Sequence, residues 1–281
     1  MRIRIRHELS QRLEPGTRNM SVTVRLTPRA HEGQFILRWA LDLSTDSRLH
    51  PQEDAFGNIC HTFSVDGPTD RLIVIAEGEV ETQDTTGIVR GTVERFPPSL
   101  FLRQTDLTEP TDALTAFADA IEAPADDTLA LLHALMVALH GKVKEVDGPP
   151  VGDPLSADAA LKAGKACAGS LAHVFTAAAR HRGIPARHIS GYVAPDDEAD
   201  GAGEGKARHW AEAYVPKIGW VSFDAGRNLC GTDHYVRLAV GLDAIGVAPL
   251  RSTGLDLEER VSAWDGRAAL KLAQAQSQGQ N

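Results

Sequence analysis

The pattern of residues changes once along this 281-residue chain, at Pro97-Pro98. Before the two prolines come short runs rich in strand-forming residues, at 21–27, 34–43 and 71–81, and turn-forming residues separate them. Alternation of apolar and polar residues is typical of strands that bury one face. Several short strands at this spacing predict a small β-sandwich or barrel over residues 1–98. In the run 34–43, one face carries only apolar residues: Phe35, Leu37, Trp39, Leu41 and Leu43.

Helical signals take over after the prolines, because capping residues now precede segments with apolar residues every three or four positions. The predicted helices are 111–121, one capped by Asp126 or Asp127, 156–164 and 167–183. The predicted strands that follow are 188–193, 207–215, 220–224 and 235–240. Helices beside strands that can pair as antiparallel neighbours predict an α+β core over residues 106–249. Residues 250–281 are expected to form a C-terminal segment and a polar tail.

Composition excludes several classes of function. The formal net charge is −9 and no basic run offsets it, which argues against nucleic acid or an anionic membrane as a partner. No apolar run approaches the roughly 18 residues that a membrane span needs. The three cysteines are widely spaced and do not form a disulfide framework, so we expect a reducing, cytoplasmic setting. The histidines lack metal-ligand spacing, and we expect neither a metal nor a cofactor.

Three residues nevertheless carry the chemistry of thiol acyl transfer: Cys167, His209 and Asp224. Cys167 begins a predicted helix, and the positive end of a helix dipole favours a thiolate. An imidazole can activate the thiol, and a carboxylate behind the imidazole fixes its tautomer. The order of Cys, His and Asp on a helix and two antiparallel strands is therefore chemically sensible.

The register of the hairpin that holds His209 and Asp224 decides which side chain meets the carboxylate. A four-residue loop at 216–219 places His209 on the face of Asp224. A loop with an odd number of residues reverses the parity and places Arg208 there. The sequence leaves both registers open.

Several short motifs are distributed over nearly the whole chain. Asp54-Ala55-Phe56-Gly57-Asn58 occupies a turn in the first domain, and the others lie in the core: Ala172-His173-Val174-Phe175, Arg182-Gly183-Ile184-Pro185-Ala186-Arg187, Ser190-Gly191-Tyr192, Gly219-Trp220-Val221-Ser222-Phe223-Asp224 and Val240-Gly241-Leu242-Asp243. With these motifs the chain resembles the bacterial transglutaminase-like proteins, which are also described as cysteine proteases. The resemblance implies an N-terminal β-sandwich and a papain-like core of helices packed on an antiparallel sheet.

The resemblance also assigns the catalytic positions. The family reads Gly-x-Cys-Gln-Asp-x-Ala-His before the helix, and alignment on Ala172-His173 places its cysteine at Ala168. The family's His-Ala-Trp motif, aligned on Trp210, places its histidine at Arg208. Asp224 occupies a catalytic position, and an ion pair with Arg208 would satisfy it. The resemblance therefore implies that the nucleophile and the base have been replaced.

Three functions follow. The first is a non-catalytic or catalytically impaired member of the family, a pseudoenzyme whose cleft binds a peptide or a protein partner. The second is an active thiol peptidase, amidase or acyl transferase with a shifted triad of Cys167, His209 and Asp224. The third is a structural interaction module whose exposed sheet edges recruit a partner. The substrate and the oligomeric state stay open.

Overall fold

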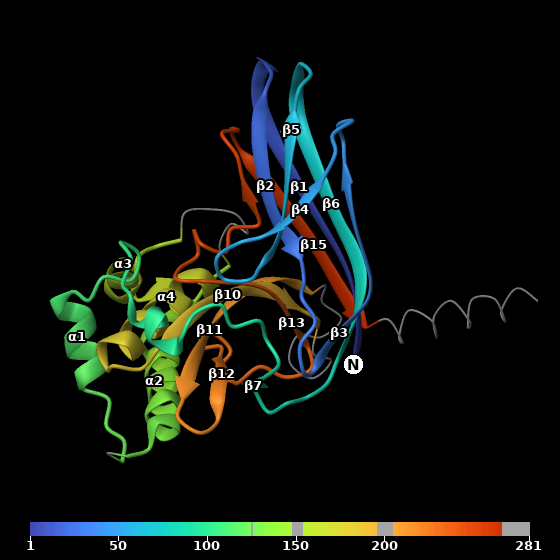
Figure 1. Ribbon diagram of the computed structural model, residues 1–281. Helices are drawn as coiled ribbons and strands as arrows, with labels where there is room; N and C mark the ends of the chain where they lie inside the picture. The colour runs from blue at the N-terminus through green and yellow to red at the C-terminus, as the bar shows by residue number, and fades with distance from the viewer. Residues whose placement is uncertain (125, 148–153, 196–204, 266–281) are drawn as a thin grey trace, which may run out of the picture.

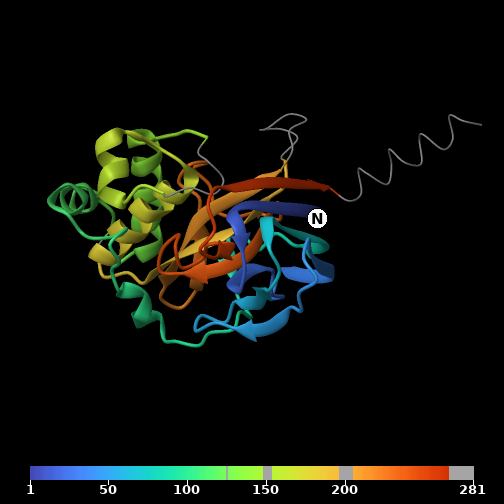
Figure 2. The same cartoon turned by 90° about the horizontal axis from the view of Figure 1, so that it is seen from above.

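The computed structural model describes residues 1–124, 126–147, 154–195 and 205–265. Two four-stranded antiparallel sheets lie on one side of the molecule, and helices packed on a five-stranded sheet lie on the other (Figures 1 and 2). The chain is thus a mixed α and β protein, as the sequence predicts. Over the residues described, none of the helices combines the length and the apolar character needed to span a bilayer.

The two four-stranded sheets share one apolar core, to which alternate residues of their strands contribute. The first sheet has the order β15-β1-β6-β3, with β15 (Leu257–Asp265), β1 (Arg2–Thr17), β6 (Thr69–Thr82) and β3 (Gln34–Leu43). The second has the order β14-β2-β5-β4, with β14 (Leu250–Arg251), β2 (Met20–Thr27), β5 (Ile59–Val65) and β4 (His50–Glu53).

A β-bulge at Leu37 divides the apolar face expected in β3. Ile36 pairs with Val80 and Arg38 with Glu79, so Leu37 is an extra residue that reverses the alternation. Trp39, Leu41 and Leu43 pack against the core as predicted. Phe35 and Leu37 point outward instead and are 44% and 45% exposed. The prediction of a single face was wrong for these two residues.

The five-stranded sheet forms the centre of the second half and has the order β13-β10-β11-β12-β7. Its strands are β13 (Tyr235–Gly241), β10 (Ala186–Val193), β11 (Lys206–Val215), β12 (Gly219–Phe223) and β7 (Ile88–Val89). The helices of this half are the 3-10 helix η1 (Pro98–Leu102), α1 (Asp112–Asp119), α2 (Thr128–Lys142), α3 (Ala157–Ala163) and α4 (Ala168–His181). A small parallel pair, β8 (Lys144–Glu145) and β9 (Lys165–Ala166), lies beside α4. Helix α4 is buried along almost its whole length and packs on β11.

Local signals set the starts of the helices as the sequence predicts. Thr111 Oγ1 accepts a hydrogen bond from the backbone of α1, and Asp127 accepts one from α2. Ser156 caps α3, which ends at Gly164 in the left-handed conformation. Cys167 is the N-cap residue of α4, although its side chain accepts no hydrogen bond from the helix. The fold therefore brings the sulfur to the beginning of the central helix.

The C-terminal segment returns to the first half of the molecule. Strand β15 pairs with β1 from Ile3 opposite Asp265 to Gln11 opposite Leu257. Conversely, β7 comes from the first half and pairs with β12 as an edge strand of the central sheet. The residues that lead into β15 cross between the halves, and they form one wall of the cleft described below.

Gly191 in β10 allows two elements to approach more closely than a larger residue would permit. A Cβ atom there would lie 2.1 Å from the Val236 carbonyl oxygen and 2.5 Å from Cη2 of Trp210. We predict that Gly191→Ala lowers the free energy of unfolding by about 3 kcal/mol in urea denaturation. The matched control is Gly141→Ala inside α2, where a Cβ would meet nothing within 4 Å. That control should gain up to about 1 kcal/mol from helix propensity, and equal effects of the two changes would contradict the packing argument.

Candidate functional site

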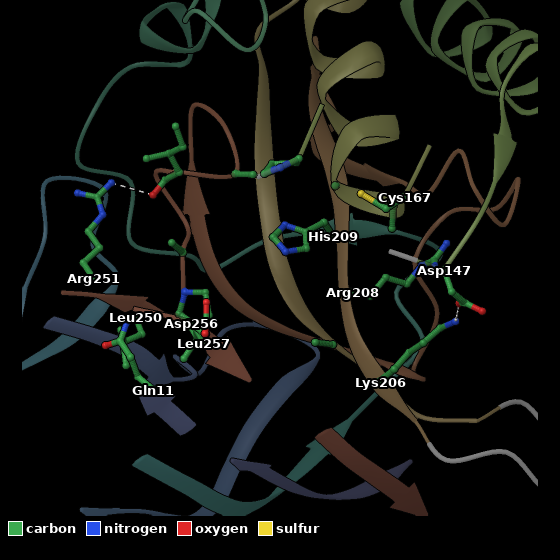
Figure 3. Close-up of a pocket in the computed structure, with 18 of the residues that line it drawn as sticks. Gln11, Asp147, Cys167, Lys206, Arg208, His209, Leu250, Arg251, Asp256 and Leu257 are labelled. Carbon is green, nitrogen blue, oxygen red and sulfur yellow. Dashed lines mark hydrogen bonds and ion pairs between the residues drawn. The ribbon is translucent and has the colours of Figure 1, made fainter. Parts of the chain in front are cut away.

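A cleft of about 750 Å³ opens between the two halves of the molecule (Figure 3). One wall is formed by Ala168 at the start of α4 and by Arg208 and His209 near the start of β11. Gln11 of β1 and Leu255, which precedes β15, belong to the opposite wall. A cleft of this size is in the range of small-ligand and peptide sites.

Cys167 lies in the wall of this cleft and is partly exposed. Its backbone is extended, with φ −75° and ψ 167°, and Ala168 begins the helix after it. The Cys167 sulfur lies 3.4 Å from Oγ of Ser170. Cys167 and its neighbour Ala168, the residue that the sequence resemblance aligns with the family's cysteine, therefore both line the same cleft.

The strands β11 and β12 pair in the register with an odd loop. Val215 lies opposite Gly219 and Ala211 opposite Phe223, so the loop consists of residues 216–218. This register reverses the parity of the four-residue alternative. Arg208, and not His209, consequently meets Asp224.

The guanidinium group of Arg208 is held between two carboxylates. Its Nη2 donates to Oδ1 of Asp224 at 2.7 Å, and its Nε donates to Oδ2 of the same residue. Its Nη1 and Nη2 donate to the two oxygens of Glu145 at 2.7 and 2.8 Å. Burial lowers the pKa of Arg208, but the hydrogen bonds and charges of the two carboxylates outweigh burial and raise it above its ordinary value. Arg208 is only 3% exposed and stays charged.

Asp224 also receives hydrogen bonds from two further donors. The Tyr235 hydroxyl donates to Oδ2 at 2.8 Å, and the backbone N–H of Arg227 donates to Oδ1 at 3.2 Å. Burial and the neighbouring carboxylate raise the pKa of Tyr235, which therefore stays a donor. Each oxygen of Asp224 thus has two donors, and none of them is an imidazole.

His209 lies on the opposite face of β11, against the first turn of α4. A Cβ atom on Gly169 would lie 3.7 Å from Cγ of His209, so the ring and the helix are in close contact. The His209 Nδ1 lies 2.8 Å from Nε2 of His188. Burial lowers the pKa of His209 to about 4, so the ring is neutral near pH 7. The structure thus brings Cys167 and His209 to one cleft and places His209 away from Asp224.

Three residues at this site carry no signal that sequence reasoning could use: Glu145, Tyr235 and His188. Glu145 comes from the two-residue strand β8 and meets Arg208 across 63 positions of sequence. Tyr235 and His188 lie at positions where an aromatic ring normally reads as part of the core. Among the residues that the structure describes, no three His, Cys, Asp or Glu side chains gather as metal ligands.

Two parts of the chain match known families. Residues 115–225 match the family model of the transglutaminase-like superfamily, and residues 3–81 match that of the bacterial transglutaminase-like N-terminal region. Residues 115–225 thus have a transglutaminase-like core, and residues 3–81 a bacterial transglutaminase-like N-terminal region. This confirms the resemblance seen in the motifs of the sequence.

Two further proteins are similar to this transglutaminase-like chain over most of its length. An uncharacterised protein of Mycobacterium leprae is 25% identical over 263 residues, which are 89% of this chain and 92% of that protein. The crystal structure of a candidate cysteine protease from Cytophaga hutchinsonii matches with a TM-score of 0.71 at 18% identity. That match covers 94% of this chain and 90% of the other, and it shows a shared fold.

Proposed function

We propose that this transglutaminase-like protein binds a peptide or a protein segment in its cleft and does not catalyse acyl transfer. The observation that carries the proposal is the place of Arg208. An arginine occupies the position of the family's base and is bound by Asp224 and Glu145. A permanently charged guanidinium cannot accept the proton of a thiol, so the carboxylate at Asp224 has no base to orient.

The nucleophile side of the site supports the same conclusion. Ala168 stands at the family's cysteine position and has no reactive group. The neighbouring Cys167 contacts the Ser170 hydroxyl, and the imidazole of His209 near it is not connected to Asp224. A thiol enzyme needs a nucleophile, a base and a group that orients the base, in contact with one another. In this site the contact between a base and its orienting carboxylate is replaced by the ion pair of Arg208 and Asp224.

The cleft itself has kept the properties of a binding site. Val146, Ile245 and Leu255 line it and are 37%, 57% and 45% exposed. Large apolar side chains exposed together at a cleft are typical of sites that bind other molecules. These three side chains would bury apolar side chains of a bound peptide. The proposed partner is therefore a peptide or a protein. A cytoplasmic location completes the proposal and is supported by the free thiols of Cys60, Cys167 and Cys230.

Two alternatives each have an observation in their favour. An active thiol peptidase, amidase or acyl transferase is favoured by Cys167 and His209, since both line the same cleft. A structural interaction module is favoured by the edge strand β3, where Phe35 and Leu37 are exposed. A free sheet edge with exposed apolar side chains can accept a strand from a partner.

Alkylation of the native protein separates the proposal from the thiol enzyme. We expect iodoacetamide to react with Cys167 at a rate within about threefold of glutathione at each pH, as for a thiol without an activating base. Mass spectrometry of the digested protein locates the adduct and distinguishes Cys167 from Cys230. A rate near neutral pH far above that of glutathione, and lost in His209→Ala, would instead establish the thiol enzyme.

A further inference from the structure

Three histidines from three different elements form a row that runs inward from the wall of the cleft. They are His173 of α4, His188 of β10 and His209 of β11. The ring centroids of His173 and His188 are 4.8 Å apart, and those of His188 and His209 are 5.0 Å apart. His173 and His188 are fully buried, whereas His209 lines the cleft. A row of buried imidazoles has a definite arrangement of protons, which its hydrogen bonds reveal.

The inner histidine, His173, is neutral and has its proton on Nδ1. Its Nδ1 lies 3.0 Å from the carbonyl oxygen of Leu155, which can only accept. Its Nε2 accepts a hydrogen bond from the backbone N–H of Ala244 at 3.0 Å. Both ring nitrogens are therefore used, and His173 exchanges no proton with His188.

The middle histidine, His188, shares one hydrogen bond with His209 and has one ring nitrogen to spare. Its Nε2 lies 2.8 Å from Nδ1 of His209, so one of these two nitrogens carries the proton. No residue in the described part of the chain gives Nδ1 of His188 a hydrogen-bond partner. Burial, followed by the neighbouring His173 and His209, lowers the pKa of His188 well below its ordinary value, and this excludes a doubly protonated ring.

Two arrangements of the protons on His188 and His209 are left. They differ in whether the unpartnered Nδ1 of His188 is a buried N–H donor or a buried acceptor. If His209 donated to His188, the proton of His188 would sit on the unpartnered Nδ1 as a buried N–H. If His188 donates, its Nδ1 is a bare lone pair. Orphaned buried N–H donors are rarer in proteins than under-satisfied acceptors.

We infer that Nε2–H of His188 donates to Nδ1 of His209, and that His209 therefore presents a neutral Nε2–H donor to the cleft, where it binds a carbonyl oxygen of a peptide. Nδ1 of His209 is directed at His188, so Nε2 is the ring nitrogen available to the cleft that His209 lines. This inference deepens the proposed function and rests on it, since it names the group of the peptide that is recognised. His188 acts as a positioning residue.

A neutral carbonyl suits this donor better than a carboxylate. Burial lowers the pKa of His209, and the buried side chain of Glu259 in β15 opposes that lowering, so its negative charge acts on the ring. An anionic ligand would be repelled by that charge, whereas an uncharged amide would not. A protonated Nε2 also has no lone pair with which to take a proton from Cys167.

The tautomer can be read directly by long-range ¹H–¹⁵N NMR of the full chain labelled with [¹⁵N]histidine. We expect His209 to show a protonated Nε2 and a bare Nδ1, and His188 to show the same tautomer. The variants His188→Gln and His188→Leu assign the signals. Glutamine can still donate to His209 and should preserve its tautomer, whereas leucine should give a mixture. A wild-type spectrum with the proton on Nδ1 of His209 would overturn the inference and leave the proposed function standing.

Two small probes test the ligand. N-acetyl-leucine N-methylamide offers only neutral carbonyl groups, and N-acetyl-leucine offers a carboxylate. We expect the amide to shift the His209 Nε2 signal downfield and the carboxylate to shift it less. A larger response to the carboxylate would overturn the ligand class, and no response to either probe would overturn the binding role of His209. Failure of the proposed function is seen separately, as His209-dependent alkylation of Cys167.

Discussion

Replacement of Arg208 by alanine should lower the free energy of unfolding by about 3 to 5 kcal/mol, the largest effect that we expect from a single change in the cleft. The reason is charge that is left behind. Asp224 is buried and would lose both of its contacts with the guanidinium group, and Glu145 would lose its partner as well. The loss is measured by urea denaturation at pH 7, with circular dichroism to confirm that the native fold is kept.

Two controls identify the cause of that loss. Arg6→Ala breaks ion pairs with Glu8 and Glu77 at the exposed surface of β1, and it should cost less than about 1 kcal/mol. The double change Arg208→Ala with Glu145→Ala should recover part of the stability, because one of the two unpaired carboxylates is then removed. A cost for Arg208→Ala no greater than that for Arg6→Ala would show that the ion pair does not hold the site together.

Features that depend on neighbouring residues, such as the starts of the helices, can be predicted from the sequence. Thr111, Asp127 and Ser156 each directly precede a helix, where a side-chain oxygen is enough to accept a hydrogen bond from a backbone N–H of the first turn. The sequence does not determine the register of the hairpin, and the reason is physical. Within the loop of residues 216–218 the left-handed residue is Lys217, with φ +69°, and the glycine of this hairpin, Gly219 with φ +104°, already belongs to β12.

Contacts between segments that are far apart in the chain could not be predicted from the sequence. Glu145 reaches Arg208 only because β8 and β9 pair at the start of α4, and a two-residue strand has no pattern. The sequence predicts only a C-terminal segment where β15 lies, because the charged residues of this strand hide its alternation. Its Glu259 turns inward instead and lies 2.7 Å from Nε2 of His7, a contact that two separate segments create together.

Reconstruction of the family's residues should give the cleft a reactive thiol. In the background Cys167→Ser, we combine Ala168→Cys with Arg208→His, and add Glu145→Gln to remove the carboxylate that Arg208 neutralised. The new imidazole would face Asp224, which already accepts from Tyr235 and is held in place. At pH 7 the introduced thiol should react with iodoacetamide about tenfold faster than in Ala168→Cys alone, because a paired imidazolium raises the fraction of thiolate.

The design contains its own test of the site. Adding Asp224→Asn should abolish most of the gain, since the carboxylate that orients the new imidazole is then lost. If the reconstructed protein folds and its thiol reacts no faster than in Ala168→Cys alone, the positions 168 and 208 are not those of the nucleophile and the base. The proposal of a replaced triad would then be wrong, because it depends on these two positions and on the parity that places Arg208 on the same face of the sheet as Asp224.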